Sequence, residues 1–147
     1  MRMLAICRLR WWKRYAVSLI MVSAIVVLSL YPLALPEPIT DVPFYDKWGH
    51  FLMYAVLTLV IWLEYAHAHR QPGHALPASL PAYSWWRLLV CGGVMPALFG
   101  GLMELLQATC TTTRAGEWAD FLADAIGVLL GIVLAAAVLR LIRSQQP

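Results

Sequence analysis

The stretch WADFLADAIGVLLGIVLAAAVL, residues 118–139, decides the fold class of this chain. Its only charged residues, Asp120 and Asp124, lie near its start, and the rest is apolar as far as Arg140. A helix needs about 20 apolar residues to cross a hydrocarbon core about 30 Å thick, so this stretch predicts a transmembrane helix. Small residues recur at every fourth position along it, at Ala119, Ala123, Gly127, Gly131 and Ala135. On a helix this spacing makes one stripe, which predicts close packing against a neighbouring helix in lipid.

Three further apolar stretches lie upstream, over residues 15–35, 48–65 and 85–107. The connectors between them are rich in proline, acidic and histidine residues, which end helices or favour water. The composition of the 147-residue chain agrees, because 61% of it is hydrophobic, only 13% is charged and its mean hydropathy is +0.69. A soluble domain has about a quarter of its residues charged. The sequence therefore predicts an all-α, polytopic membrane protein, a bundle of four transmembrane helices.

The domain organisation and orientation follow from these stretches. We expect a basic N-terminal segment over residues 1–14, a single membrane domain over 15–142 and a short tail over 140–147, with no soluble catalytic domain. Of the eleven Lys and Arg residues, all but Lys47 and Arg114 lie on the side of the two termini. Positive charges stay in the cytoplasm, which predicts a multi-pass protein of the bacterial inner membrane with both termini cytoplasmic. The net charge of +3 is then explained by the orientation of the protein in the membrane, and no nucleic-acid partner is expected.

Ionisable residues gather at the predicted outer ends of three spans. Asp46, His50 and Tyr54 are spaced by four and share a helix face, with Lys47 beside them. The remaining members lie at the end of the third span, in the loop after it and at the start of the fourth span, namely Glu104, Gln107, Arg114, Asp120 and Asp124. Charges inside a bilayer cost several kcal/mol unless they are paired or hydrated. So many at one depth favour a functional pocket over simple ties between helices.

The order of these polar motifs resembles that of the VanZ-like family of small bacterial membrane proteins. The matching residues are Asp46-Lys47-x-x-His50-Phe51-x-x-Tyr54, then Glu104-x-x-Gln107, then Arg114, and then Asp120 with Gly127 and Gly131. The family usually has Asn where this chain has Asp124, so here the pocket holds either an additional anion or a protonated carboxyl. The resemblance implies a four-helix inner-membrane protein. It leaves two kinds of role open: one of the glycopeptide-resistance type, because the name-giving member is associated with resistance to teicoplanin, and a housekeeping role in the envelope, because many members lie far from any resistance cluster. It supplies no reaction.

One interpretation of the pocket is an enzyme or binding protein for membrane lipids, acting on the headgroup of an envelope lipid or a lipid-linked cell-wall precursor. His50 titrates near neutrality, and it would form an acid/base pair with Glu104 or Asp46. Lys47 and Arg114 would hold a phosphate. The other polar residues of the pocket would contribute to binding, and these are Tyr54, Gln107, Asp120 and Asp124.

Two other interpretations stay open at this point. The first is a divalent metal site, although the sequence requires no cofactor. Its candidate ligands suit Mg, Mn or Zn, and they are His50, Asp46, Glu104, Asp120 and Asp124. The second is a non-enzymatic envelope scaffold or a small proton-coupled transporter, since membrane carboxylates often mark proton paths. The polar residues crowd one end of the spans, so a path across the membrane would require the chain to oligomerise.

Overall fold

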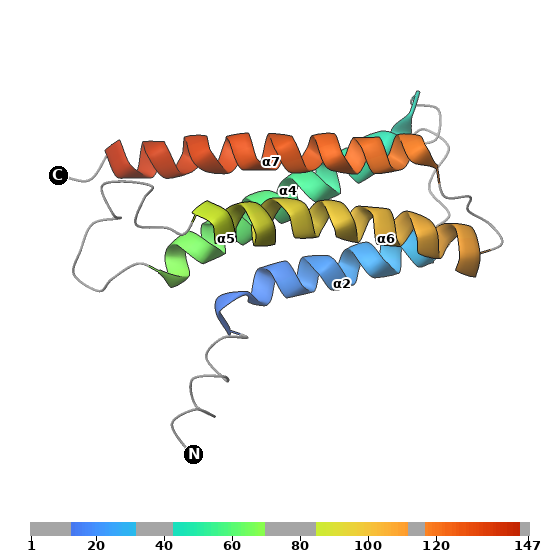
Figure 1. The fold of residues 1–147 in the computed structure, drawn as a ribbon, viewed down its shortest axis with the longest axis horizontal. Coiled ribbons are helices and arrows are strands. Elements are labelled where there is room, and N and C mark those ends of the chain that lie inside the picture. The colour runs from blue at the N-terminus through green and yellow to red at the C-terminus, as the bar shows by residue number, and fades with distance from the viewer. Residues whose placement is uncertain (1–12, 32–42, 70–84, 112–116, 145–147) are drawn as a thin grey trace, which may run out of the picture.

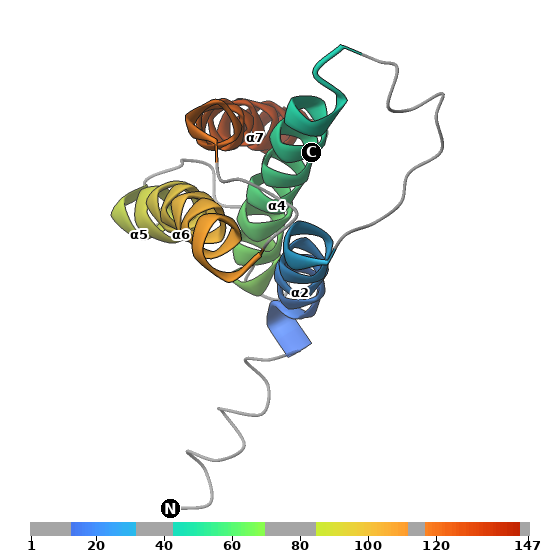
Figure 2. The same ribbon diagram turned by 90° about the vertical axis from the view of Figure 1, so that its right-hand side faces the viewer.

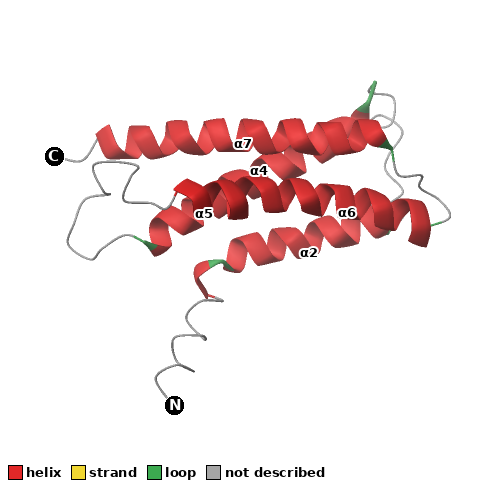
Figure 3. Cartoon of the chain, in the orientation of Figure 1, coloured by secondary structure: helices red, strands yellow, loops and turns green. Residues whose placement is uncertain are grey.

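The computed structural model describes residues 13–31, 43–69, 85–111 and 117–144. Nearly all of these residues are helical, and none of them is in a strand (Figure 3). The helices, in chain order, are α2 (Ala16–Leu30), α4 (Tyr45–Ala68), α5 (Trp85–Leu89), a π-helical turn (Val90–Val94), α6 (Met95–Cys110) and α7 (Trp118–Ser144).

Three helical segments of the described chain are long and apolar enough to cross a membrane, namely Tyr45–Ala68, Trp86–Cys110 and Trp118–Ile142. They confirm the predicted spans at 48–65, 85–107 and 118–139. All three continue beyond the predicted C-terminal end, and the segment at 45–68 also begins earlier than predicted. The predicted first span, 15–35, contains α2, which is apolar but shorter, and residues 32–42 lie outside the described part. The chain is thus an all-helical membrane protein with three candidate spans and one shorter apolar helix.

The helices run along a common long direction, with α4 in the middle. Seen end-on, α4 lies between α7, the α5–α6 segment and α2 (Figure 2), and it contacts all of them. The start of α4, the end of α6 and the start of α7 lie at one end of the bundle (Figure 1), which we call the site end. The end of α4 and the starts of α2 and α5 lie at the opposite end. Residues distant in sequence therefore meet at the same depth.

Glycines bring α7 into backbone contact with α4. A Cβ atom at Gly127 would collide with the backbone of Phe51, and one at Gly131 would collide with the backbone of Ala55. The absence of these side chains lets the two helices approach closely, as small residues do in membrane bundles.

The small-residue stripe predicted on α7 is used only in part. Gly127, Gly131 and Ala135 are buried, whereas Ala119 is exposed and Ala123 is half-buried. Near the site end the buried positions of α7 are instead Asp120 and Asp124, which lie one residue along from the predicted stripe. The same face of the helix thus changes from polar at its start to small and apolar further along.

The third span is interrupted by the π-helical turn Val90–Val94. The Trp62 indole of α4 donates a hydrogen bond from Nε1 to the Gly92 carbonyl oxygen over 3.1 Å, and both residues are buried. A Cβ at Gly92 would lie only 2.5 Å from Trp62 Nε1, so glycine is required there. Trp62 also belongs to an apolar cluster at the opposite end, together with Ala66, Leu88, Ala135 and Leu139.

Helix α2 is attached to the other helices by polar bonds near both of its ends. At its start, the Glu64 carboxylate of α4 accepts hydrogen bonds from the backbone N–H groups of Val17 and Ser18, at 3.0 and 3.2 Å, and from the Ser18 hydroxyl. The first N–H groups of a helix have no partner within the helix, and a carboxylate there both accepts from them and complements the helix dipole. At its other end, Gln107 Nε2 of α6 donates to the Ser29 carbonyl oxygen over 2.9 Å.

Candidate functional site

Three helices bring one histidine and two carboxylates together at the site end. His50 Nδ1 on α4 lies 3.0 Å from Asp124 Oδ1 on α7 and 3.7 Å from Glu104 Oε1 on α6. The His50, Glu104 and Asp124 side chains are 7%, 10% and 0% exposed. We call these three residues the buried cluster. They are the central part of the pocket predicted from the sequence.

The space for the buried cluster comes from a glycine on α6. A Cβ at Gly100 would lie 2.6 Å from Asp124 Oδ2, so only glycine lets this carboxylate lie against the helix. Glu104 follows Gly100 by one turn and therefore shares its face. The second oxygen of Glu104, Oε2, accepts a hydrogen bond from the backbone N–H of Glu117 over 2.9 Å, which holds the side chain in position.

Four buried oxygen atoms in and below the buried cluster have no hydrogen-bond partner among the described residues, namely Glu104 Oε1, Asp124 Oδ2, Tyr54 Oη and Thr58 Oγ1. Tyr54 follows His50 by one turn of α4, and its hydroxyl is within electrostatic range of both carboxylates. Buried polar groups in folded proteins are nearly always hydrogen-bonded. These atoms therefore indicate a partner other than the described residues, such as ordered water or a ligand.

A second group of charges lies closer to the end of the bundle, around Lys47. Lys47 Nζ lies 3.0 Å from Asp46 Oδ2, 3.0 Å from Glu117 Oε2 and 3.1 Å from Asp120 Oδ1. The Asp46 and Glu117 side chains are 43% and 55% exposed. We call these four residues the Lys47 cluster. Its ammonium group is bonded by three carboxylates, so a phosphate held by Lys47 would compete with them, and that role stays a prediction.

The remaining predicted site residues lie in different places. The Asp46 carboxylate, expected beside His50, contacts Lys47 instead. Gln107 is buried, and its Nε2 donates a hydrogen bond to the backbone of α2, which connects two helices. Arg114 lies outside the described residues.

Sequence reasoning left Glu117 out of the candidate site, although it joins the two clusters. Its backbone N–H bonds Glu104 of the buried cluster, and its carboxylate bonds Lys47. The residue directly precedes the apolar stretch 118–139. Its spacing of three from Asp120 was the available signal, because residues so spaced share a helix face.

An apolar groove of about 590 Å³ lies between α6 and α7, and Glu104 is the member of the buried cluster that lines it. Its apolar walls are formed by Leu98, Leu102, Leu105, Trp118 and Phe121, and it is also lined by Glu104 and Glu117. Four of the wall residues, Leu98, Leu102, Leu105 and Trp118, are exposed on the surface of the bundle. Glu104 thus borders both an exposed apolar groove and a buried polar cluster.

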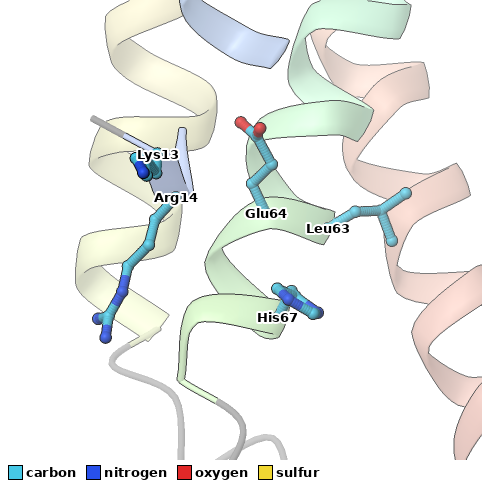
Figure 4. Close-up of a pocket in the computed structure, with 5 residues that line it drawn as sticks. All are labelled: Lys13, Arg14, Leu63, Glu64 and His67. Carbon is cyan, nitrogen blue, oxygen red and sulfur yellow. The ribbon is translucent and has the colours of Figure 1, made fainter. Parts of the chain in front are cut away.

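A second pocket, of about 510 Å³, lies at the opposite end and is lined by Lys13, Arg14, Leu63, Glu64 and His67. Figure 4 shows the Arg14 side chain pointing away from Glu64. The Glu64 carboxylate is occupied by the start of α2, as described above. This pocket therefore lacks the convergent polar groups that the site end has.

The chemistry open to the buried cluster follows from its atoms. An ionised carboxylate only accepts hydrogen bonds, so His50 Nδ1 carries a proton when it bonds ionised Asp124. That bond orients the ring, as carboxylates do for basic histidines.

Comparisons of the chain with models of protein families, with curated proteins and with solved structures find no match.

Proposed function

We propose that the chain is a VanZ-like, four-helix protein of the bacterial inner membrane that binds the headgroup of an envelope lipid or of a lipid-linked cell-wall precursor. The observation that carries this proposal is the position of Glu104, which lines the apolar groove and belongs to the buried cluster. A lipid has the same division, an apolar chain joined to a polar headgroup. Its chain would lie in the groove between α6 and α7, and its headgroup would reach Glu104 and His50.

The four-helix arrangement and the orientation are parts of the same proposal. Helix α2 packs beside α4 and α6, and the apolar sequence that contains it continues to residue 35. With residues 15–35 as the first span and the basic termini in the cytoplasm, the site end faces outward. The pocket then lies where envelope lipids and lipid-linked precursors present their headgroups outside the cell.

The charges favour a headgroup that donates hydrogen bonds. Lys47 is held by three carboxylates, and the buried cluster contributes two more acids. Carboxylates accept from hydroxyl and amino groups and repel phosphate, so the hydroxyls of a sugar or an amine suit this site better than a bare phosphate. With Asp124 holding its ring, His50 can also act as a general base toward such a hydroxyl.

The distribution of polar residues supports a site at one end over a path across the membrane. The buried polar side chains of α4 are His50, Tyr54 and Thr58. Beyond Thr58 toward the opposite end, the buried interior is occupied by the apolar cluster around Trp62. A proton or solute path would have to pass through closely packed apolar side chains there.

A lipid profile tests the proposal directly. A strain lacking the protein is complemented with the intact chain, with Glu104→Gln, or with Glu64→Gln as a matched control at the opposite end. We expect at least one envelope lipid or lipid-linked species to change in level with Glu104→Gln and not with the control, measured by mass spectrometry. Leu102→Trp, which fills the groove, should give the same change. If the profiles of the intact chain and both site variants coincide at equal membrane abundance, the protein does not handle a lipid headgroup.

A further inference from the structure

We infer that the buried cluster binds a divalent transition-metal ion, with His50, Glu104 and Asp124 as its three protein ligands. Each residue offers one ligand atom, and these atoms all lie within 4.8 Å of one another. They come from three different helices, α4, α6 and α7. The inference deepens the proposed function, since it concerns the same site, but it rests on separate observations of charge and geometry. With the ion bound, it would take the place of the proton between His50 Nδ1 and Asp124, and the ion would bind the headgroup in place of a free His50 base.

The distances between the ligand atoms agree with a shared metal. Zn²⁺ and similar ions bind nitrogen and oxygen at about 2.1 Å, which separates two ligands by about 3.0 Å at a right angle and about 3.6 Å at 120°. His50 Nδ1 lies 3.0 Å from Asp124 Oδ1 and 3.7 Å from Glu104 Oε1. Both distances that involve His50 are therefore those of ligands on one ion, and all three ligand atoms lie within 4.8 Å of one another.

The charge of the buried cluster favours a bound cation. Two ionised carboxylates and a neutral imidazole carry a charge of −2, and their side chains are at most 10% exposed. Charges in such a place are retained when they are paired or bind a metal. The nearest described cation, Lys47, is bonded by three other carboxylates. A divalent ion matches the charge of the cluster.

The unpartnered atoms point to the same place. Glu104 Oε1 and Asp124 Oδ2 are buried and have no hydrogen-bond partner among the described residues. Asp124 itself is 0% exposed. Carboxylate oxygens in that condition are costly unless a cation is near. The second oxygen of Asp124 would allow it to bind the ion through either atom.

The donor set selects the kind of metal. One imidazole nitrogen with two carboxylates suits Zn²⁺ or Mn²⁺, whereas Ca²⁺ and Mg²⁺ prefer oxygen ligands alone. Three protein ligands leave at least one position on the ion for another ligand, as in catalytic zinc sites. A hydroxyl or amino group of the headgroup would reach the ion from the groove beside Glu104.

Metal analysis of the full chain tests this inference. The protein is purified in detergent without chelator, and its metal content is measured by plasma mass spectrometry. We expect about one equivalent of Zn or Mn in the intact chain and in Glu64→Gln, and less than a tenth of that in Glu104→Gln and His50→Ala. After dialysis against a chelator, addition of Zn²⁺ or Mn²⁺ should raise the melting temperature of the intact chain and leave that of Glu104→Gln unchanged.

Two results would overturn the inference. One is a folded intact chain that holds no metal and whose melting temperature does not respond to Zn²⁺ or Mn²⁺, which would make the cluster a hydrogen-bonded group sharing protons. The other is equal metal content in the intact chain and Glu104→Gln, which would place the ion elsewhere. Neither measurement involves a lipid. A metal-containing chain with an unchanged lipid profile would refute the proposed function and leave the metal site standing.

Discussion

Replacing Gly127 with alanine tests the contact between α4 and α7 on which the position of the buried cluster depends. Asp124 stands one turn before Gly127 on α7, so a shift of the helix at Gly127 moves the Asp124 carboxylate away from His50. In the structure, a Cβ at Gly127 would overlap the backbone carbonyl of Phe51. Backbone cannot rotate aside as a flexible side chain can, so the two helices have to separate.

The size of the effect can be isolated with a second glycine. Gly49 also lies within a helix, and a Cβ there would meet nothing within 4 Å. Both Gly→Ala changes add about 0.5–1 kcal/mol of helix-forming tendency. Only Gly127→Ala adds the overlap, and overpacking of this kind costs about 1–3 kcal/mol. We therefore expect Gly127→Ala to be less stable than Gly49→Ala by about 1–3 kcal/mol.

Reversible unfolding in mixed detergent micelles, followed by circular dichroism, measures this difference between the two variants. Gly49→Ala should be as stable as the unmodified chain or slightly more stable. Equal unfolding free energies for the two variants would refute the close contact between α7 and the backbone of α4. The metal content and lipid effect of Gly127→Ala should then also be unchanged.

Two further predictions concern α2 and the orientation. Glu64→Ala removes the acceptor for the N–H groups of Val17 and Ser18 and should lower the unfolding free energy by about 1–3 kcal/mol. Glu64→Gln keeps an oxygen acceptor and should lower the unfolding free energy by less. Equal decreases in the two variants would contradict the contact. A reporter enzyme that is active only outside the cytoplasm should work when fused after Thr112 and fail when fused after Gly73, and the reverse pattern would place the site end in the cytoplasm.

The helices and the depth of the polar groups could be predicted from the sequence because both depend on spacing along the chain. The apolar run at 118–139 has the length of a span, and it is confirmed as part of the helical segment Trp118–Ile142. Successive spans cross the membrane in opposite directions, so the second and the fourth spans begin on the same side. His50 at the start of one and the acidic residues at the start of the other therefore lie at the same depth. Their meeting in the buried cluster follows from that topology.

The pairing of side chains could not be predicted, because it depends on how each helix is rotated and which neighbour it faces. Asp46 and His50 share a spacing of four, yet Asp46 bonds Lys47 while His50 bonds Asp124. Gln107 was expected in the pocket, but α6 is rotated so that this side chain meets the α2 backbone. Periodicity identifies the face on which a residue lies, and it contains no information about the partner across the interface.

The two charge clusters differ in what they require from their surroundings, and that difference supports the buried cluster as the proposed binding site. Around Lys47 three acids face one cation, but Asp46 and Glu117 are 43% and 55% exposed, so water can solvate the excess negative charge. In the buried cluster no side chain is more than 10% exposed, and solvation cannot compensate the charge there. The excess negative charge has to be neutralised by protons or by a bound cation. Either one would also give a partner to the unpartnered oxygens of Glu104 and Asp124. The Lys47 cluster can be neutralised by its own lysine and by water, whereas the buried cluster needs protons or a bound cation, and the proposed metal site supplies the second.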